Sequence, residues 1–194
     1  MAKAAIGKKV VKNAMANVIH GKLRTNVPAG NASPGTNLGN QLGQRGINIA
    51  AFCKDFNART SHYVEGVPLP IRVSVNPDRS YKLVIHSPTT SFLIKQAAGI
   101  QRGAMRYTDE TVGWITLKHV YEIALIKSRD PPLELTPLKQ ICEMVIGQAR
   151  YMGIKTVRDY DPEEYKEFLE KQRLVVESQL QECKEKREAK LLRK

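Results

Sequence analysis

The stretch TPLKQICEMVIGQARYMG, residues 136–153, has the features of one complete amphipathic helix. Thr136 is a residue type that caps helix N-termini, Pro137 suits the first helical position, and Gly153 suits the left-handed residue just past the end. Apolar residues recur at steps of three and four, namely Leu138, Ile141, Cys142, Val145, Ile146, Ala149 and Met152. This spacing predicts a helix that packs one apolar stripe against a core.

The opposite face of this predicted helix is polar and contains a glycine. Lys139, Gln148, Arg150 and Tyr151 lie away from the stripe, and Gly147 is among them. A glycine inside a helix costs about 1 kcal/mol relative to alanine, so a close approach to the backbone is its natural explanation. Two interpretations stay open: a nucleic-acid strand approaches Gly147, or a neighbouring helix packs closely against it.

The charge of the chain points to a polyanionic partner. The 194 residues include 31 Lys and Arg against 19 Asp and Glu, for a formal net charge of +12. Residues 162–194 contain nine basic and eight acidic residues, so almost all of the excess positive charge lies in residues 1–161. A basic excess of this kind favours phosphate contacts, and nucleic acid is the first candidate.

The first half of the chain predicts a basic arm followed by a small α+β domain. Residues 1–19 have four lysines and no acid, which fits either an arm that touches RNA or an organelle-import signal. Within 20–87 we expect a strand at 22–27, a helix that Asn48 caps, and a hairpin with strands at 71–75 and 81–85 around the turn 76–79.

A glycine-rich stretch, residues 28–46, interrupts this first domain. It lacks the Gly-Lys-Ser/Thr ending of a phosphate-binding P-loop, because Gln44 and Arg45 follow Gly43. It is also too polar for a membrane helix-packing motif. Two interpretations remain: a loop or loose helix that contacts a partner through its backbone, or a plain surface loop.

The second half predicts three short helices around one core, residues 91–158, after a linker at 88–90. The first helix ends at Gly99, a polar loop runs from Gln101 to Gly113, Thr116 caps the second helix, and the opening stretch is the third. In the second helix we expect a stripe of Leu117, Val120, Tyr121, Ala124 and Leu125, with Lys118 and Lys127 pointing outward. Tyr107 and Trp114 are of a type that stacks on bases, although Trp114 beside Ile115 fits a core better.

A charged extension, residues 159–194, follows this domain. From Asp161-Pro162 it predicts one long helix with a thin apolar stripe of Tyr165, Leu169, Val176, Leu180 and Cys183. Such a helix either lies along a partner or remains free and partly frayed.

No group of residues predicts catalysis, a metal site or a cofactor. His20, His62, His86 and His119 lack paired carboxylates and His-x-x-x-His spacing; His119 has Glu122 one turn away but no third ligand, so a solvated surface histidine is the better interpretation. Cys53, Cys142 and Cys183 are odd in number and far apart, which favours small buried thiols. No apolar run reaches the ~20 residues that span a bilayer.

Five blocks, in order, resemble ribosomal protein eleven of the large subunit. They are GQRGINIAAFCKDFNART (43–60), VPLPIRVSVNPDRSYKLVI (67–85), LIKQAAGI (93–100), VGWITLKHVYEIALIK (112–127) and GQARYMGI (147–154). The ITLKHVYEIA block and the charged extension are more similar to the mitochondrial branch, and the acid-free start agrees with import. The resemblance implies a two-domain α+β protein of the mitochondrial ribosome, at the base of the stalk.

The resemblance also implies partners and site residues. In that family the three-helix domain grips folded large-subunit rRNA, and the N-terminal domain meets translational GTPases and acidic stalk proteins; neither a membrane nor an obligate homo-oligomer is implied. The implied RNA-binding residues are Lys95, Gly99, Arg102, Gly103, Arg106, Thr116, Lys118, Gly147, Gln148, Arg150, Tyr151 and Gly153. The implied factor-facing residues are Asn37, Gly39, Gly43, Gln44, Arg45 and Lys54.

The chain departs from the family pattern in two regions. Gln148 and Tyr151 replace a usual threonine and serine, so the RNA contacts must differ, and Tyr151 can stack where serine would donate a hydrogen bond. Residues 36–40 replace the usual Pro-Pro-x-Gly-Pro, which predicts weak binding of thiopeptide antibiotics. The alternative function is a helix-turn-helix DNA-binding regulator that reads bases with Gln148 and Arg150.

Overall fold

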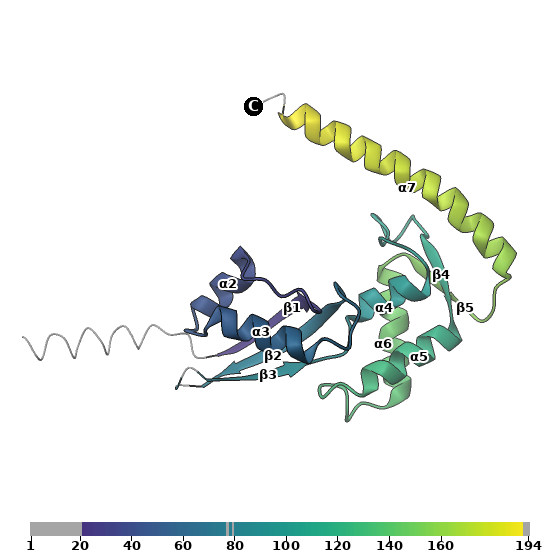
Figure 1. Cartoon of the computed structure of the whole chain (residues 1–194). Helices are drawn as coiled ribbons and strands as arrows, with labels where there is room; N and C mark the ends of the chain where they lie inside the picture. The colour runs from purple at the N-terminus through teal and green to yellow at the C-terminus, as the bar shows by residue number, and fades with distance from the viewer. Residues whose placement is uncertain (1–20, 77, 79, 192–194) are drawn as a thin grey trace, which may run out of the picture. The chain divides into compact units, whose positions relative to one another are not determined.

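The chain folds into two compact units that divide between Thr89 and Thr90. The computed structural model describes residues 21–191 except 77 and 79 (Figure 1). For Thr36 and Asn37 it describes the backbone but not the side chains. The predicted basic arm, His20 and half of the predicted hairpin turn therefore lie outside the described residues. Helices and strands are mixed in both units, which confirms the predicted α+β class.

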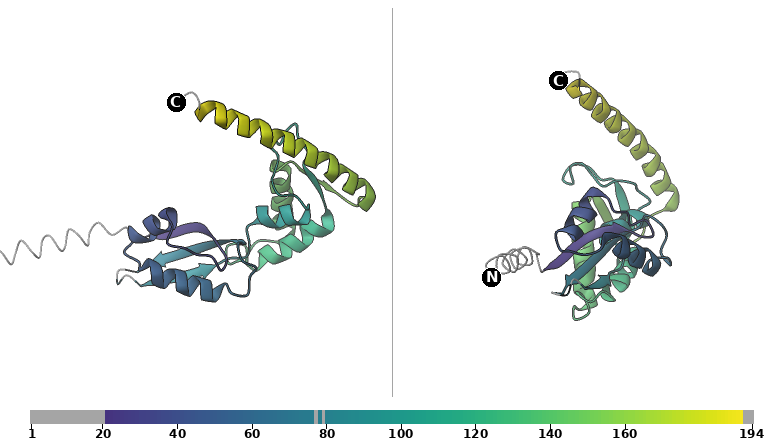
Figure 2. Two further views of the ribbon diagram at one scale, coloured as in Figure 1. Left: turned by 45° about the horizontal axis from the view of Figure 1, so that its top comes forward. Right: turned by 60° about the vertical axis from the view of Figure 1, so that its left-hand side comes forward.

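The first unit is a three-stranded antiparallel sheet with helices packed on it. Strands β1 (Lys22–Pro28), β2 (Pro68–Val75) and β3 (Tyr81–Ile85) run in that order across the sheet, and α2 (Thr36–Gly43) and α3 (Ile49–Arg59) connect β1 to β2. Figure 2 shows α3 lying along the sheet. Register places Leu23 and Leu83 on either side of Val73, and these buried residues share a core with Phe52 and Phe56.

Three of the local predictions for this unit are confirmed. The strand and the hairpin form as expected, and the side chain of Asn48 accepts hydrogen bonds from the amides of Ala50 and Ala51 at 3.1 and 3.3 Å. The glycine-rich stretch is in part a helix, α2, because Leu42 is fully buried and anchors that helix to the core.

The second unit contains the three predicted helices and a small sheet that was not predicted. Helices α4 (Thr90–Ala97), α5 (Leu117–Ser128) and α6 (Leu138–Tyr151) share a core that includes Ile94, Val120 and Val145. Strands β4 (Gly113–Thr116) and β5 (Ile154–Val157) pair in parallel, with Ile115 opposite Thr156. Each strand has four residues, too few for a periodic pattern to reveal, and their pairing is distant in sequence.

The start of α6 differs from its prediction. Pro137, not Thr136, is the N-cap residue, and the amides of Gln140 and Ile141 donate to its carbonyl oxygen at 2.9 and 3.2 Å. Thr136 belongs to the preceding turn, where its amide donates to Leu133. The stripe of α6 and its left-handed end are confirmed: Ile141, Val145 and Ala149 are buried, and Gly153 has φ +73°.

The buried face of α5 is also rotated from the expected one. Leu117 and Tyr121 are 45% and 49% exposed, whereas Ile123 and Lys127 are buried, and the Lys127 ammonium donates to Asp130. Thr116 caps the helix as predicted. It is also the last residue of β4, so the helix follows the strand without a connecting loop. His119 is not a solvated histidine, because its Nδ1 accepts the Thr116 amide in a capping box.

The long helix α7 (Pro162–Leu191) begins on its own domain. Tyr165 is buried, and its hydroxyl donates to the carbonyl of Ala98 at 2.6 Å and accepts the amide of Trp114 at 3.2 Å. The rings of Tyr165 and Phe168 stack with Trp114 at centroid distances of 5.6 and 4.9 Å. Trp114 is half-buried and packs against the first turns of α7, outside the core that the three helices share with Ile115.

In the described ranges no helix combines the length and the apolar character needed to cross a bilayer. The longest of them, α7, is interrupted by charged side chains throughout.

Candidate nucleic-acid interface

One face of α6 is open around Gly147. A Cβ atom added at Gly147 would meet no described atom within 4 Å, so no neighbouring helix packs there. That removes the helix-packing interpretation of this glycine and leaves its backbone open to an outside partner. Gln148 and Arg150 are exposed beside it, while Val145 and Ala149 turn to the core.

The end of α6 is fixed to the loop that precedes β4. The amide of Ala104 donates to Met152 at 2.9 Å, and the amide of Val112 donates to Gly153 at 2.8 Å. A Cβ at Gly153 would lie 2.4 Å from the Cβ of Ala104 and 2.6 Å from the carbonyl oxygen of Glu110. The glycine therefore serves both the turn and the close packing of the loop on the helix end.

Two further loop residues with implied RNA contacts are already engaged within the chain. Arg102 donates to the side chain of Gln179 on α7 and lies 3.5 Å from the carboxylate of Glu110, which leaves its side chain 27% exposed. A Cβ at Gly103 would lie 3.3 Å from the carbonyl of Met152, so the loop backbone packs tightly there. By contrast, Arg106 is exposed.

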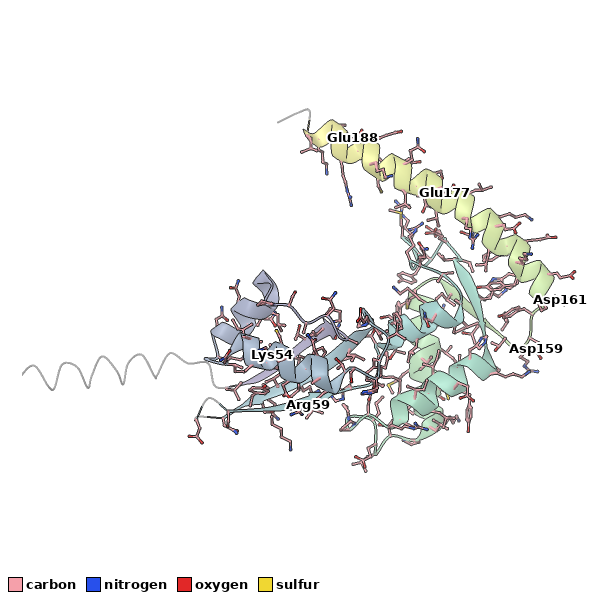
Figure 3. All side chains as sticks on the ribbon, in the orientation of Figure 1. Lys54, Arg59, Asp159, Asp161, Glu177 and Glu188 are labelled. Atoms are coloured by element: carbon pink, nitrogen blue, oxygen red, sulfur yellow. The ribbon has the colours of Figure 1, made fainter. Side chains whose placement is uncertain are left out.

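The remaining residues of the implied RNA-binding set lie on α4 and α5. Lys118 is 83% exposed, and its 3.5 Å ion pair with the equally open Asp159 (Figure 3) contributes little, because water screens exposed pairs. Thr116 accepts the His119 amide as a helix cap, Lys95 is half-buried in the last turn of α4, and Gly99 closes that helix with φ +65°. Lys118 is thus available to phosphates, while Thr116 and Gly99 already have structural roles.

Sequence reasoning missed one pairing at this surface. The rings of Tyr107, from the loop, and Tyr151, from the end of α6, meet edge to face with centroids 5.4 Å apart. Both side chains stay open, at 52% and 71% exposure. Local patterns cannot reveal this contact, because it depends on how the loop folds back onto Met152 and Gly153.

The implied factor-facing residues gather mostly on α2 and the turn after it. Gly43 and Gln44 are exposed, Gly39 is half-buried, and Arg45 donates to the carbonyl of Gln41 at 2.7 Å; the Asn37 side chain lies outside the described set. Lys54 is exposed on α3 (Figure 3), where Arg59 pairs with Asp55 at 2.8 Å.

The cysteines are free thiols in the structure, and Cys53 is buried. Burial raises the pKa of the Cys53 thiol, which keeps it neutral. Within the described residues, no three histidine, cysteine or acidic side chains come together in a way that could hold a metal ion.

The second unit thus presents an exposed arginine and an open helix backbone beside a loop that is fixed to the end of the same helix. Two family models match the chain in order. "Ribosomal protein L11, N-terminal domain" matches residues 23–81, and "Ribosomal protein L11, RNA binding domain" matches residues 86–156. The chain belongs to the ribosomal protein L11 family, whose members are structural components of the ribosome and not enzymes.

Individual relatives agree with this assignment. A "Large ribosomal subunit protein uL11m" of Drosophila melanogaster is 59% identical over 194 residues, which cover 100% of this chain and 99% of the relative. The protein of the same name in Caenorhabditis elegans is 52% identical over 187 residues, or 95% of each chain. A "Large ribosomal subunit protein uL11" of the bacterium Roseobacter denitrificans is 40% identical over 141 residues, 73% of this chain and 99% of that one.

Proposed function

We propose that this protein is a structural constituent of the large ribosomal subunit in mitochondria, where its second unit binds large-subunit rRNA. The RNA-binding family model supports this, as do two relatives whose names mark them as uL11m. The observation that carries the proposal is the open backbone of α6 at Gly147, with Gln148 and Arg150 exposed beside it.

The geometry suits folded RNA. An A-form helix hides its major groove and displays a wide, shallow minor groove, so a protein helix recognises it by shape and by contacts to phosphates and 2′-hydroxyls. At Gly147 the RNA backbone can approach the helix without a side chain between them. Arg150 and Lys118 supply positive charge for phosphates, and such contacts position the protein on the RNA.

The first unit has a separate role in the proposal. We infer that the exposed end of α2, with Gly43 and Gln44, and the exposed Lys54 of α3 face translational GTPases and acidic stalk proteins. The exposed Lys54 is complementary to acidic partners, and such complementarity speeds association.

The decisive experiment measures binding of the full chain to a transcript of the folded rRNA segment at several salt concentrations. We expect the logarithm of affinity to fall linearly with the logarithm of salt, with a slope of about −0.7 to −0.9 per phosphate contacted. Gly147→Leu should weaken binding by about 1–3 kcal/mol, the usual range for inserting a side chain into a packed contact.

A matched control separates contact from folding. Gln140→Leu introduces the same side chain at an exposed position in the first turns of α6 and should leave RNA affinity unchanged. A folded Gly147→Leu variant with wild-type affinity would contradict this placement of the RNA. Competition with duplex DNA tests the helix-turn-helix alternative, which the family membership does not favour.

A further inference from the structure

The end of α6 carries a feature that open backbone and positive charge do not explain. Tyr107 and Tyr151 are 52% and 71% exposed, yet their rings contact each other with a centroid distance of 5.4 Å at an interplanar angle of 60°. Exposure of large aromatic rings to water is unfavourable. Among the hydrogen bonds that the structure describes, none involves the hydroxyl of either tyrosine and explains the pairing. We call these two rings the tyrosine pair.

The tyrosine pair is held in place before any partner arrives. Tyr151 is the last residue of α6, directly before the Met152 and Gly153 carbonyls that accept the amides of Ala104 and Val112. On the loop side, the carbonyl of Arg106 accepts the amide of Glu110 at 3.0 Å, and the carboxylate of Glu110 accepts the Met105 amide at 2.9 Å. These bonds fix the turn that presents Tyr107, so little ordering entropy remains to be lost on binding.

The charge around the tyrosine pair fits a nucleic acid. Each tyrosine follows an exposed arginine in sequence, Arg106 before Tyr107 and Arg150 before Tyr151. Asp109 is the exposed acid of the same turn, while Glu110 is half-buried and engaged with Arg102 and Met105. Aromatic rings flanked by arginines combine the two features by which proteins hold unpaired nucleotides: stacking on the base and attraction of the phosphate.

We propose that the tyrosine pair is a stacking platform for one unpaired base of the bound RNA, adjacent to the helical segment that docks at Gly147. This rests on the proposed rRNA-binding function and adds to it a requirement for RNA structure. The binding site must contain a bulged or looped nucleotide beside the docked helix, because a base inside a continuous duplex has no free face to offer an aromatic ring.

The test uses the full chain with three variants and the folded rRNA transcript. Tyr107→Leu and Tyr151→Leu remove the aromatic face, and each should weaken binding by roughly 5- to 150-fold, the effect of losing one base–aromatic stack. The slope of affinity against salt should stay unchanged, since no phosphate contact is lost. Tyr121→Leu, at a tyrosine of α5 that is 49% exposed, is the matched control and should bind like the wild type.

A second arm identifies the base. Each unpaired nucleotide of the transcript is made abasic in turn. One of these abasic RNAs should bind the wild type more weakly than the intact RNA does. The Tyr151→Leu variant should bind that abasic RNA and the intact RNA equally. Tyrosine variants with wild-type affinity, or equal losses on every abasic RNA, would overturn the stacking platform. Normal RNA affinity combined with failure to assemble into ribosomal particles would also overturn it, because the pair would then contact a protein.

The two proposals fail differently. If the wild type and Gly147→Leu bind the transcript equally, the placement of RNA on α6 is wrong, and the platform is wrong with it. If Gly147→Leu weakens binding while both tyrosine variants bind normally, RNA binding at α6 stands and the platform alone is wrong. Melting temperatures of all variants confirm that they are folded.

Discussion

Helices α6 and α7 both repeat apolar residues at helical spacing, yet the second unit uses them in different ways. α6 buries Ile141, Val145 and Ala149 along its whole length and is closed by Gly153 at its end. α7 has thirty residues but only Tyr165 is buried. Its aromatic contacts lie in the first turns, and the hydrogen bond from Arg102 to Gln179 is a polar contact farther along. Leu174 and Leu180 farther along are 69% and 51% exposed.

The difference shows which features of a helix depend on its neighbours. A wide stripe fixes α6 in the core, so its outer face can leave Gly147 bare without loss of order. The thin stripe leaves most of α7 exposed. Its first turns are held by an aromatic cluster and by the Tyr165 hydroxyl, which donates to the Ala98 carbonyl and accepts the Trp114 amide. The predictions below test this contrast between a helix packed along its length and a helix fixed at its start.

The first of two comparably large effects is expected from Gly153→Ala, which breaks the closure of α6. The left-handed conformation costs a non-glycine residue about 1–2 kcal/mol, and the clash with Ala104 and Glu110 adds about 1–3 kcal/mol. Gly99→Ala is the matched control, because Gly99 has φ +65° but no atom within 4 Å of an added Cβ, so only the first cost applies. Urea unfolding of both variants checks this; equal losses would mean that the loop moves aside freely.

A second comparison truncates one side chain in each helix. Ile141→Ala should destabilise the second unit by about 2–5 kcal/mol, since Ile141 is 1% exposed and its removal leaves a cavity. Leu174→Ala on α7 should change stability by less than about 0.5 kcal/mol, as for other exposed positions. Chemical denaturation measures both, and a large loss at Leu174 would show that α7 is packed along its length after all.

Tyr165→Phe tests the attachment of α7. The variant keeps the ring that stacks on Trp114 but removes the hydroxyl, which should cost about 1–3 kcal/mol because the Trp114 amide loses its acceptor in a half-buried site. Hydrogen exchange should speed up in the first turns of α7 and remain unchanged in α6. Faster exchange in both helices would indicate that the two are one cooperative element.

The smallest effect is an alkaline one. Burial is the main cause that raises the pKa of Tyr165 above its ordinary value of 10.0, while the hydrogen bond from Trp114 acts in the opposite direction. Because the pKa of Tyr165 is higher in the folded state than in the unfolded state, the neutral hydroxyl contributes to the free energy of unfolding. This contribution is complete below the unfolded pKa of about 10 and is lost as the pH rises through the higher folded pKa. Thermal melting at pH 9 to 11 should therefore fall more steeply for the wild type than for Tyr165→Phe.

Local features of the sequence were enough to predict most of the secondary structure. The cap at Asn48, the alternation in β2 and β3, the stripe of α6 and the left-handed Gly153 are each decided by neighbours in the chain. Some errors arose where distant residues decide. The face that α5 buries is one such case, since Ile123 and Lys127 are buried in a domain where β4, directly before α5, pairs with the distant β5. The cap of α6 is a local error, because Thr136 belongs to the turn that starts at Leu133 and Pro137 is the N-cap.

The candidate site was predictable only in part. The open face at Gly147 follows from the polar side of α6. Lys118 and Arg106, for which the family resemblance implies RNA contacts, are exposed, and their contact with RNA stays a prediction. The engagement of Arg102 by Gln179 joins residues seventy-seven positions apart, and the contact of Tyr107 with Tyr151 requires the folded loop. No local rule connects such pairs.

The parallel pairing of β4 with β5 affects the order in which this domain is completed during synthesis. All of α5 and α6 must leave the ribosome before Ile154 can reach Gly113, and closing so long a segment is slow relative to helix formation. Trp114 belongs to β4 and is synthesised before β5, whereas Tyr165 and Phe168, which stack on Trp114, are synthesised after β5. A nascent chain therefore leaves the Trp114 indole uncovered until the first turns of α7 have been made.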